Sequence, residues 1–280
     1  METEAKKALV IDLEKRTSEV KSFKDLNKFV GGVGLGLKLL EIYREENPVV
    51  MSVGPLNGFF PFASKTSVVL TDSGVIEDLY VGGSLSLRIK FAGVDSIVLC
   101  KKAKEEMVLD ILNTQVSFKP KDTDLQSLGL PGKKCLVSTQ SKKVLVNDYF
   151  STPENFLENS FKEKNVQGIS ITGTETYKPD NFGSYEKLYQ NILSREGDLS
   201  VEKGIYPSCS NCPMGCGKSK VGEIGGNVLI HSLVACQYAD KVYSDIGIVF
   251  SCLNSLGYDY THEDLENLPK LIEDTLKGLS

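Results

Sequence analysis

Three of the seven cysteines lie within eight positions of one another, in the segment CSNCPMGC, which contains Cys209, Cys212 and Cys216. The spacing C-x2-C-x3-C lets three thiolates reach one metal centre, and Pro213 and Gly215 permit the tight turns that direct the sulfurs inward. An iron–sulfur cubane and a zinc ion each need a fourth ligand, which can lie far away in the sequence. Spacing alone therefore leaves three interpretations open: an iron–sulfur cluster, a zinc site, or packed or redox-active thiols.

The fourth ligand is expected among the residues that follow this segment. Cys236 is the nearest remaining thiol, and we expect it on the apolar face of the next helix. His231 is an alternative ligand for zinc, although a position on a helix surface is the simpler interpretation. Cys100, Cys135 and Cys252 lie singly in apolar stretches and are predicted to be buried packing residues.

The composition excludes several classes of protein. Scattered single cysteines in a 280-residue chain do not indicate a disulfide framework and favour a reducing, cytoplasmic setting. The opening METEAKKALVIDL lacks the pattern of a signal peptide, and no run approaches the roughly 18 apolar residues of a membrane span. A net charge of -5, with lysines interleaved among acidic residues, predicts neither nucleic-acid nor membrane binding.

The order of elements predicts an α+β protein with a β-rich base and a helical region after it. Short β-branched runs separated by Gly, Pro, Asn and Asp predict strands within 8–23, 48–54, 65–81, 95–103, 105–120, 133–140, 142–150 and 165–173. Helical spacing is expected in 34–46, 84–93, 153–165, 184–197, 229–257 and 262–279. The change in pattern near Asp180 predicts a β-rich domain over 1–180 and a helical region over 181–280 that carries the cysteine loop.

Two further motifs receive structural interpretations. The glycines of GGVGLG, residues 31–36, do not have the spacing or the acidic partner of a dinucleotide site, and they predict a helix start with close packing or positive φ. Glu77, Asp78 and Asp95 are expected to be exposed turn carboxylates rather than acid–base groups.

Several stretches resemble the tungsten-containing aldehyde ferredoxin oxidoreductase family, over its N-terminal domain and the start of its helical domain. The cysteine segment is similar to the family's Cys-x-x-Cys-Pro-x-Gly-Cys loop. GGSLSLRIKFAGVDSIVLCKKA, from Gly82 to Ala103, is similar to its Gly-Gly pair and the helix that ends Leu-Lys-Phe-Ala-Gly-x-Asp. SLVACQYADKVYSDIGIVFSCLNSLGYD resembles the first helices after the cluster.

The resemblance implies a β-rich base that carries a tungsten bis-pterin beside a 4Fe-4S cluster, which relays electrons from aldehydes to ferredoxin. Lys65 stands where the family has an arginine that contacts this tungstopterin, and Gly82 and Gly83 permit close backbone approach. Tyr80 stands where the family has an asparagine that helps to hold magnesium. The family's Arg- and Gly-rich phosphate loop corresponds to residues 158–173, which contain no arginine.

These departures predict an aldehyde ferredoxin oxidoreductase-like iron–sulfur protein with a degraded tungstopterin site. It would act as an oxidoreductase component or electron-transfer subunit, with a second chain that supplies the missing helical domains and a ferredoxin-type redox partner. Cys209, Cys212, Cys216 and Cys236 are the expected cluster ligands. The alternative is a non-catalytic scaffold or interaction protein with a structural zinc or iron–sulfur site.

Overall fold

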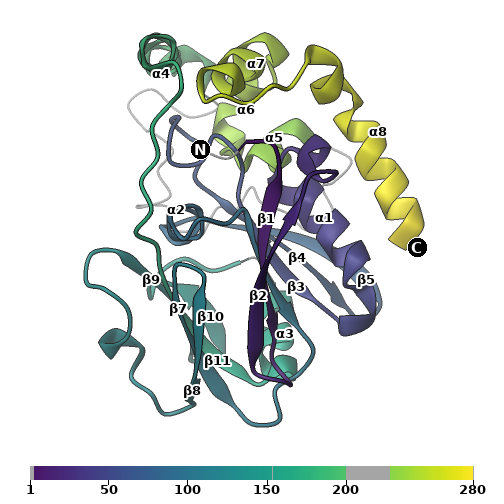
Figure 1. Ribbon diagram of the computed structural model, residues 1–280, viewed down its shortest axis with the longest axis vertical. Coiled ribbons are helices and arrows are strands. Elements are labelled where there is room, and N and C mark those ends of the chain that lie inside the picture. Colours follow the sequence, from purple (N-terminus) through teal and green to yellow (C-terminus); the bar gives the residue numbers. More distant parts are fainter. Residues whose placement is uncertain (1–2, 153, 200–227, 280) are drawn as a thin grey trace.

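The computed structural model describes residues 3–152, 154–199 and 228–279, and these form an α+β fold with two sheets (Figure 1). One sheet has six strands in the order β2-β1-β6-β3-β4-β5. Its members are β1 (Lys6–Asp12), β2 (Thr17–Phe23), β3 (Val49–Ser52), β4 (Thr66–Asp72), β5 (Val75–Val81) and β6 (Ser96–Cys100). β1 and β6 run parallel, and the other neighbours in this sheet are antiparallel.

The second sheet has five strands in the order β10-β9-β11-β7-β8. Its members are β7 (Met107–Leu112), β8 (Gln115–Pro120), β9 (Lys134–Gln140), β10 (Lys143–Val146) and β11 (Val166–Thr172). β7 and β11 are parallel, while the pairs β7–β8, β9–β10 and β9–β11 are antiparallel. The chain passes from β7 to β11 through β8, β9, β10 and helix α3 (Phe156–Lys164), and parallel neighbours need such a long crossover.

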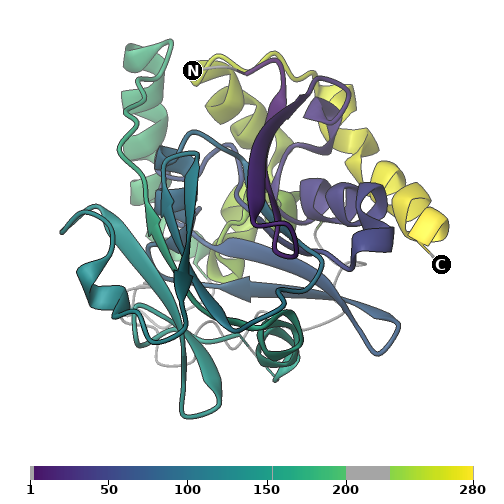
Figure 2. The same ribbon diagram turned by 60° about the horizontal axis from the view of Figure 1, so that its bottom comes forward.

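Helices cover the six-stranded sheet and connect the strands. They are α1 (Gly32–Ile42), α2 (Leu85–Phe91), α3 (Phe156–Lys164), α4 (Phe182–Ser194), α5 (Val228–Leu233), α6 (Asp240–Tyr243), α7 (Ile246–Ser255) and α8 (His262–Leu279). α1 and α8 contact each other and lie side by side in both views (Figures 1 and 2). No helix among the described residues is long and apolar enough to cross a membrane.

The six-stranded sheet is buried on both faces, which explains the nearly continuous apolar sequence of its inner strands. Successive strand residues point to opposite faces, so that Ala8 and Val10 belong to one core cluster and Leu9 and Ile11 to the other. The second cluster joins the two sheets. The first cluster joins the opposite face to α1 and to the helices of residues 228–279, including Leu253.

Each predicted strand region contains strands, and each predicted helical region contains helix. One placement was wrong: α5 ends at Leu233, so Cys236 lies beyond the helix and not on its face. The chain turns there because Ala235 forms an isolated antiparallel bridge with Ala63. The division of the chain near Asp180 stays a prediction, and the first core cluster contains residues from both sides of it.

Candidate cofactor site

Lys65 lies immediately before β4 and is almost completely buried, with 2% of its surface exposed. Its backbone N–H donates to the carbonyl of Val234 at 3.1 Å, so the helical region holds this loop directly. The Nζ atom lies 5.8 Å from the centroid of the Tyr80 ring, within the range of a cation–π contact. The lysine charge is thus directed at an aromatic face of the neighbouring strand.

Tyr80 occupies the centre of this region. Its ring makes an edge contact with His231, with centroids 4.6 Å apart, and its hydroxyl donates to Asp78 Oδ2 at 3.1 Å. His231 was expected on a helix surface, and this expectation was wrong: it is 5% exposed because α5 packs against the β4–β5 hairpin side of the sheet. Tyr80 therefore bridges Lys65 and the helical region.

The expectation that Glu77, Asp78 and Asp95 are exposed turn carboxylates was wrong. Asp78 is fully buried and Glu77 is 6% exposed, because both lie within a strand of seven residues and not in a turn. Burial raises the pKa of the Glu77 carboxyl, and the charge of Asp72 raises it further. Asp95 is half-buried, and one of its oxygens accepts the backbone N–H of Lys7 at 2.9 Å.

A row of polar side chains that the sequence did not predict crosses the six-stranded sheet and ends at Tyr80. Ser96, Ser52, Ser67 and Tyr80 are register partners on β6, β3, β4 and β5, so they share one face. The hydroxyls of Ser52 and Ser96 lie 2.7 Å apart and form a hydrogen bond. Strand register places these residues together, and no local motif indicates it.

The segment 231–236 packs backbone to backbone against the base. Gly32 has a φ of +45°, and a Cβ there would lie 2.3 Å from the carbonyl oxygen of His231. A Cβ at Gly54 would lie 2.3 Å from the carbonyl oxygen of Leu233. The predicted structural role of the GGVGLG glycines, positive φ with close packing, is confirmed at Gly32.

Gly82 and Gly83 follow β5, where the resemblance implies close approach of a cofactor. Gly83 has a φ of +90°, and a Cβ there would lie 2.9 Å from Cδ2 of Phe150 and 3.3 Å from Cγ1 of Val146. Gly82 is buried. Side chains from the end of β10 and the residues after it therefore occupy the space in front of Gly83.

The described residues do not fit a bis-pterin. Its phosphates need several matched cations and amide donors, whereas Lys65 is directed at a ring and the cradle at Gly83 is filled by Phe150. Both amide atoms of buried Asn57 and the hydroxyls of Ser67 and Ser232 have no hydrogen-bond partner, but these groups carry no charge. Within the described ranges no group of three or more His, Cys, Asp or Glu side chains is arranged to hold a metal ion.

Of the four expected cysteine ligands, three belong to one segment and the fourth, Cys236, lies further along the chain. Cys209, Cys212 and Cys216 lie outside the described residues. Cys236 is described and is 7% exposed, and its backbone N–H donates to the carbonyl of Phe62 at 2.6 Å. It therefore lies beside the loop that leads to Lys65.

The remaining predicted packing thiols, Cys100, Cys135 and Cys252, are fully buried, which confirms that prediction. Burial raises the pKa of each of these thiols to about 12. A thiolate is the form that binds metals and attacks electrophiles, so these three side chains are chemically inert in the folded protein.

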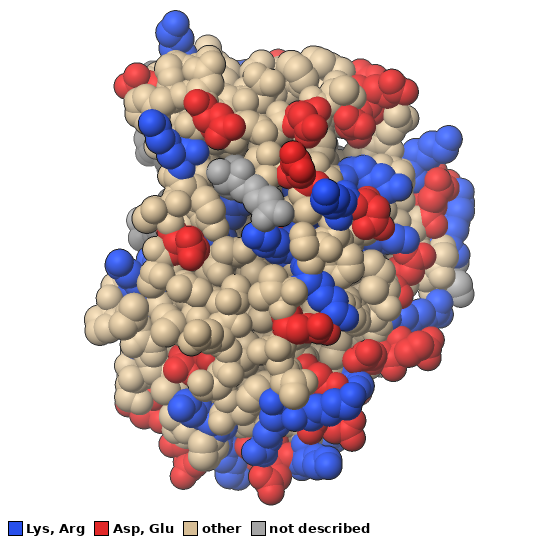
Figure 3. Space-filling model, in the orientation of Figure 1, with Lys and Arg blue, Asp and Glu red and all other residues tan. Residues whose placement is uncertain are grey.

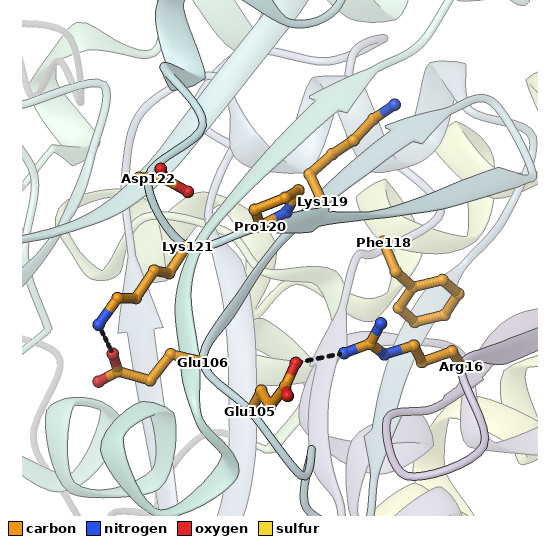
Figure 4. A pocket seen from close by; sticks show the side chains of 8 residues that line it. All are labelled: Arg16, Glu105, Glu106, Phe118, Lys119, Pro120, Lys121 and Asp122. Carbon is orange, nitrogen blue, oxygen red and sulfur yellow. Dashed lines mark hydrogen bonds and ion pairs between the residues drawn. The ribbon is translucent and has the colours of Figure 1, made fainter.

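A cavity of about 600 Å³ lies near the β1–β2 turn and the β7–β8 hairpin (Figure 4). Among its charged side chains, Arg16 pairs with Glu105 at 3.3 Å and Lys121 pairs with Glu106 at 2.9 Å, and Lys119 and Asp122 also line the cavity. Basic and acidic side chains are likewise interspersed over the face shown in Figure 3. The described lining of the cavity has equal numbers of basic and acidic side chains, so it has no excess charge that would favour an ionic ligand.

Comparison with known proteins identifies the base. Residues 8–146 match the family described as aldehyde ferredoxin oxidoreductase, N-terminal domain. Residues 8–146 therefore form an N-terminal domain of the aldehyde ferredoxin oxidoreductase family, as the motifs at Gly82 to Ala103 imply.

Two particular relatives are informative. The aliphatic sulfonate oxidoreductase, WOR-like subunit, of Pyrococcus furiosus is 34% identical over 129 residues, which cover 40% of this chain and 20% of the relative. The chain thus spans about a fifth of the length of this curated relative. The active site complex BamBC of benzoyl coenzyme A reductase, solved with 1,5-dienoyl-CoA, matches 74% of this chain and 36% of its own with a TM-score of 0.63. At 18% sequence identity this second likeness concerns the fold alone.

Proposed function

We propose that this chain is an iron–sulfur component of an aldehyde ferredoxin oxidoreductase-like complex, which transfers electrons and has a degraded tungstopterin site. The observation that carries the proposal is the environment of Tyr80. At the position of the family's oxygen ligand, a buried aromatic ring contacts both Lys65 and His231. An aromatic ring supplies no ligand for the magnesium between pterin phosphates.

Energetics favour the loss of the pterin over its retention. Charge-assisted hydrogen bonds contribute about 1.5–3 kcal/mol each, so the loss of several leaves buried anions without compensation. Lys65 is the one expected cofactor residue that still carries charge, and it lacks the bidentate fork of arginine. We expect no stoichiometric tungsten or molybdenum and no extractable pterin in the purified chain. About one tungsten or molybdenum atom per chain in elemental analysis would contradict this part of the proposal.

The retained centre is proposed to be a 4Fe-4S cluster bound by Cys209, Cys212, Cys216 and Cys236. When bound, such a cluster supplies one-electron transfer. The position of Cys236 supports this assignment, because the backbone bridge at Ala235 holds it beside the base. A cluster at Cys236 would therefore lie close to the former cofactor region.

Anaerobic purification with analysis of iron, acid-labile sulfide and zinc tests the cluster. We expect brown protein that contains iron and sulfide, and Cys212→Ser should remove the colour while far-UV circular dichroism shows a folded base. Colourless wild-type protein with one zinc per chain would exclude the iron–sulfur assignment.

A second measurement tests the fourth ligand. Cys236→Ser should change the EPR spectrum of the reduced cluster, whereas Cys252→Ser, at a fully buried position in α7, should leave it unchanged. An unchanged spectrum in Cys236→Ser would show that the ligand comes from elsewhere.

A second chain that supplies helical domains, and a ferredoxin-type redox partner, are part of the proposal. The names of the two relatives support the second chain, since one relative is a subunit and the other a complex. Affinity purification of tagged protein under anaerobic conditions, followed by mass spectrometry, should recover a stoichiometric second chain. Size-exclusion chromatography would then separate a stable complex from chance contaminants.

The alternative function is a non-catalytic scaffold with a structural zinc or iron–sulfur site. The filled space at Gly83 favours it, because no catalytic cofactor can approach there without displacement of Phe150. Reversible reduction by dithionite and reoxidation by ferredoxin distinguishes an electron-transfer subunit from a scaffold with zinc. An electron-transfer subunit completes this cycle, and a scaffold with zinc does not.

A further inference from the structure

A separate cavity of about 430 Å³ lies where the end of α2, residues 173–179 and the start of α4 meet. Its lining includes five aromatic side chains: Phe59, Phe91, Tyr177, Phe182 and Tyr185. Both its volume and its aromatic lining are typical of pockets that bind small molecules. Neither Lys65 nor the glycines after β5 line it, so it is distinct from the candidate cofactor site.

Hydrogen bonds hold two of the rings in place. The hydroxyl of Tyr185 donates to the carbonyl of Phe59 at 2.7 Å, and that of Tyr177 donates to the carbonyl of Lys90 at 3.0 Å. Tyr177 also stacks on Phe91, with centroids 6.3 Å apart and an interplanar angle of 28°. The Nζ atom of Lys90 lies 5.9 Å from the centroid of the Tyr177 ring. Because the two hydroxyls are engaged elsewhere, both rings are held in place, and the apolar surface that they present to the cavity needs no reordering on binding.

Among the aromatic residues of the cavity, Phe182 is a large apolar side chain that is not buried by packing. It is 53% exposed at the first position of α4, with its ring centroid 5.9 Å from that of Tyr185. A large apolar side chain exposed at the rim of a cavity is a feature of ligand-binding surfaces.

Two basic side chains also line the cavity. Arg88 donates to the carbonyls of Gly132 at 3.1 Å and Gly173 at 3.4 Å, while its Nε is buried without a hydrogen-bond partner. Lys133 is exposed and forms no ion pair with the described residues. Glu175 supplies the one carboxylate of the described lining, so the cavity has an excess of one positive charge.

We propose that this cavity binds a small planar aromatic anion, with its ring against Tyr177, Phe182 and Tyr185 and its negative group at Arg88 and Lys133. The apolar walls select a flat ring, since aromatic pairs add stacking energy to burial. The basic side chains select the charge, since a carboxylate is the natural partner of a guanidinium and an ammonium group. This site is independent of the proposed electron-transfer function.

Isothermal titration with 2-naphthoate tests the proposal on the full chain. We expect saturable binding, with 2-naphthamide and cyclohexanecarboxylate each at least about tenfold weaker, because the first lacks the charge and the second lacks the aromatic ring. The chain contains no tryptophan, so the fluorescence of bound naphthoate gives a second readout without tryptophan emission.

Variants locate the binding. Phe182→Ala and Lys133→Ala should each weaken naphthoate binding at least about fivefold, and both side chains are exposed enough to be removed without loss of the fold. Tyr149→Ala, at a tyrosine 52% exposed outside the cavity, and Lys104→Ala, at another exposed lysine, are the matched controls and should bind as the wild type does. Absence of saturable binding, equal affinity for the amide, or wild-type affinity in both cavity variants would overturn the proposal.

Discussion

Replacement of Lys6 by methionine is expected to stabilise the protein. Lys6 lies in β1 and is 2% exposed, with its Nζ 5.2 Å from the ring centroid of Tyr258 and 5.7 Å from that of Tyr260. Burial lowers its pKa from 10.5 to about 8, an effect that the nearby charge of Asp95 opposes and that of Lys90 reinforces. The ammonium group is therefore held in an environment that disfavours its charge.

The size of the effect follows from the pKa. At 1.36 kcal/mol per pH unit, a decrease from 10.5 to about 8 means that charged Lys6 costs about 3 kcal/mol more in the folded than in the unfolded protein. Methionine keeps most of the apolar stem but loses the contact with the two rings, which is worth about 1 kcal/mol. Lys6→Met should therefore raise the free energy of unfolding by about 2 kcal/mol near neutral pH.

The pH dependence gives the sharper test. Because the folded pKa lies below the unfolded one, the cost is present in full below about pH 8 and disappears as the pH rises toward 10.5. The stability difference between Lys6→Met and the wild type should thus decrease by about 2–3 kcal/mol between about pH 7 and pH 10. Urea unfolding followed by far-UV circular dichroism at both pH values measures it.

Lys164 is a second buried lysine, but unlike Lys6 its ammonium group has hydrogen-bond acceptors among the described residues. Burial also lowers its pKa to about 8, but its ammonium group donates to the carbonyls of Asn47 and Lys101. Lys164→Met leaves these carbonyls without their donor and should be less favourable than Lys6→Met. The reasoning is refuted if Lys6→Met is less stable than the wild type near neutral pH, or if its stability difference does not change with pH.

Two other outcomes are expected. Gly54→Ala should lower the free energy of unfolding by at least about 2 kcal/mol in urea, because the new methyl group would meet the carbonyl of Leu233 at 2.3 Å. Gly197→Ala, with no atom within 4 Å, should not, and equal effects would contradict the proposed close packing. Iodoacetamide at about pH 8 should leave Cys100 and Cys252 unmodified in folded protein, since burial raises both pKa values to about 12. Peptide mass spectrometry checks this against denatured protein, and labelling of either thiol in the folded state would show that the burial argument is wrong.

Local patterns in the sequence were enough to predict the strands and helices of the base. The hairpin of β1 and β2, for example, follows from two β-branched runs around a polar turn, and α1 follows from a glycine pair and apolar helical spacing. The KFAG motif and the glycines before it also indicated the family, because these residues are contiguous. Local patterns suffice for such features, since neighbours in the chain decide them.

The surroundings of the candidate site depend on contacts between distant parts of the chain, which local patterns do not predict. His231 and Tyr80 are about 150 positions apart in the chain, and no local pattern of either one predicts that their rings meet. The serine row across β6, β3 and β4 depends on register, and the aromatic cavity depends on the fold that brings the end of α2, residues 173–179 and the start of α4 together. Burial of Asp78 and His231 is likewise a property of the assembled layers and not of the flanking residues, because accessibility is set by whatever packs on top of a strand or helix.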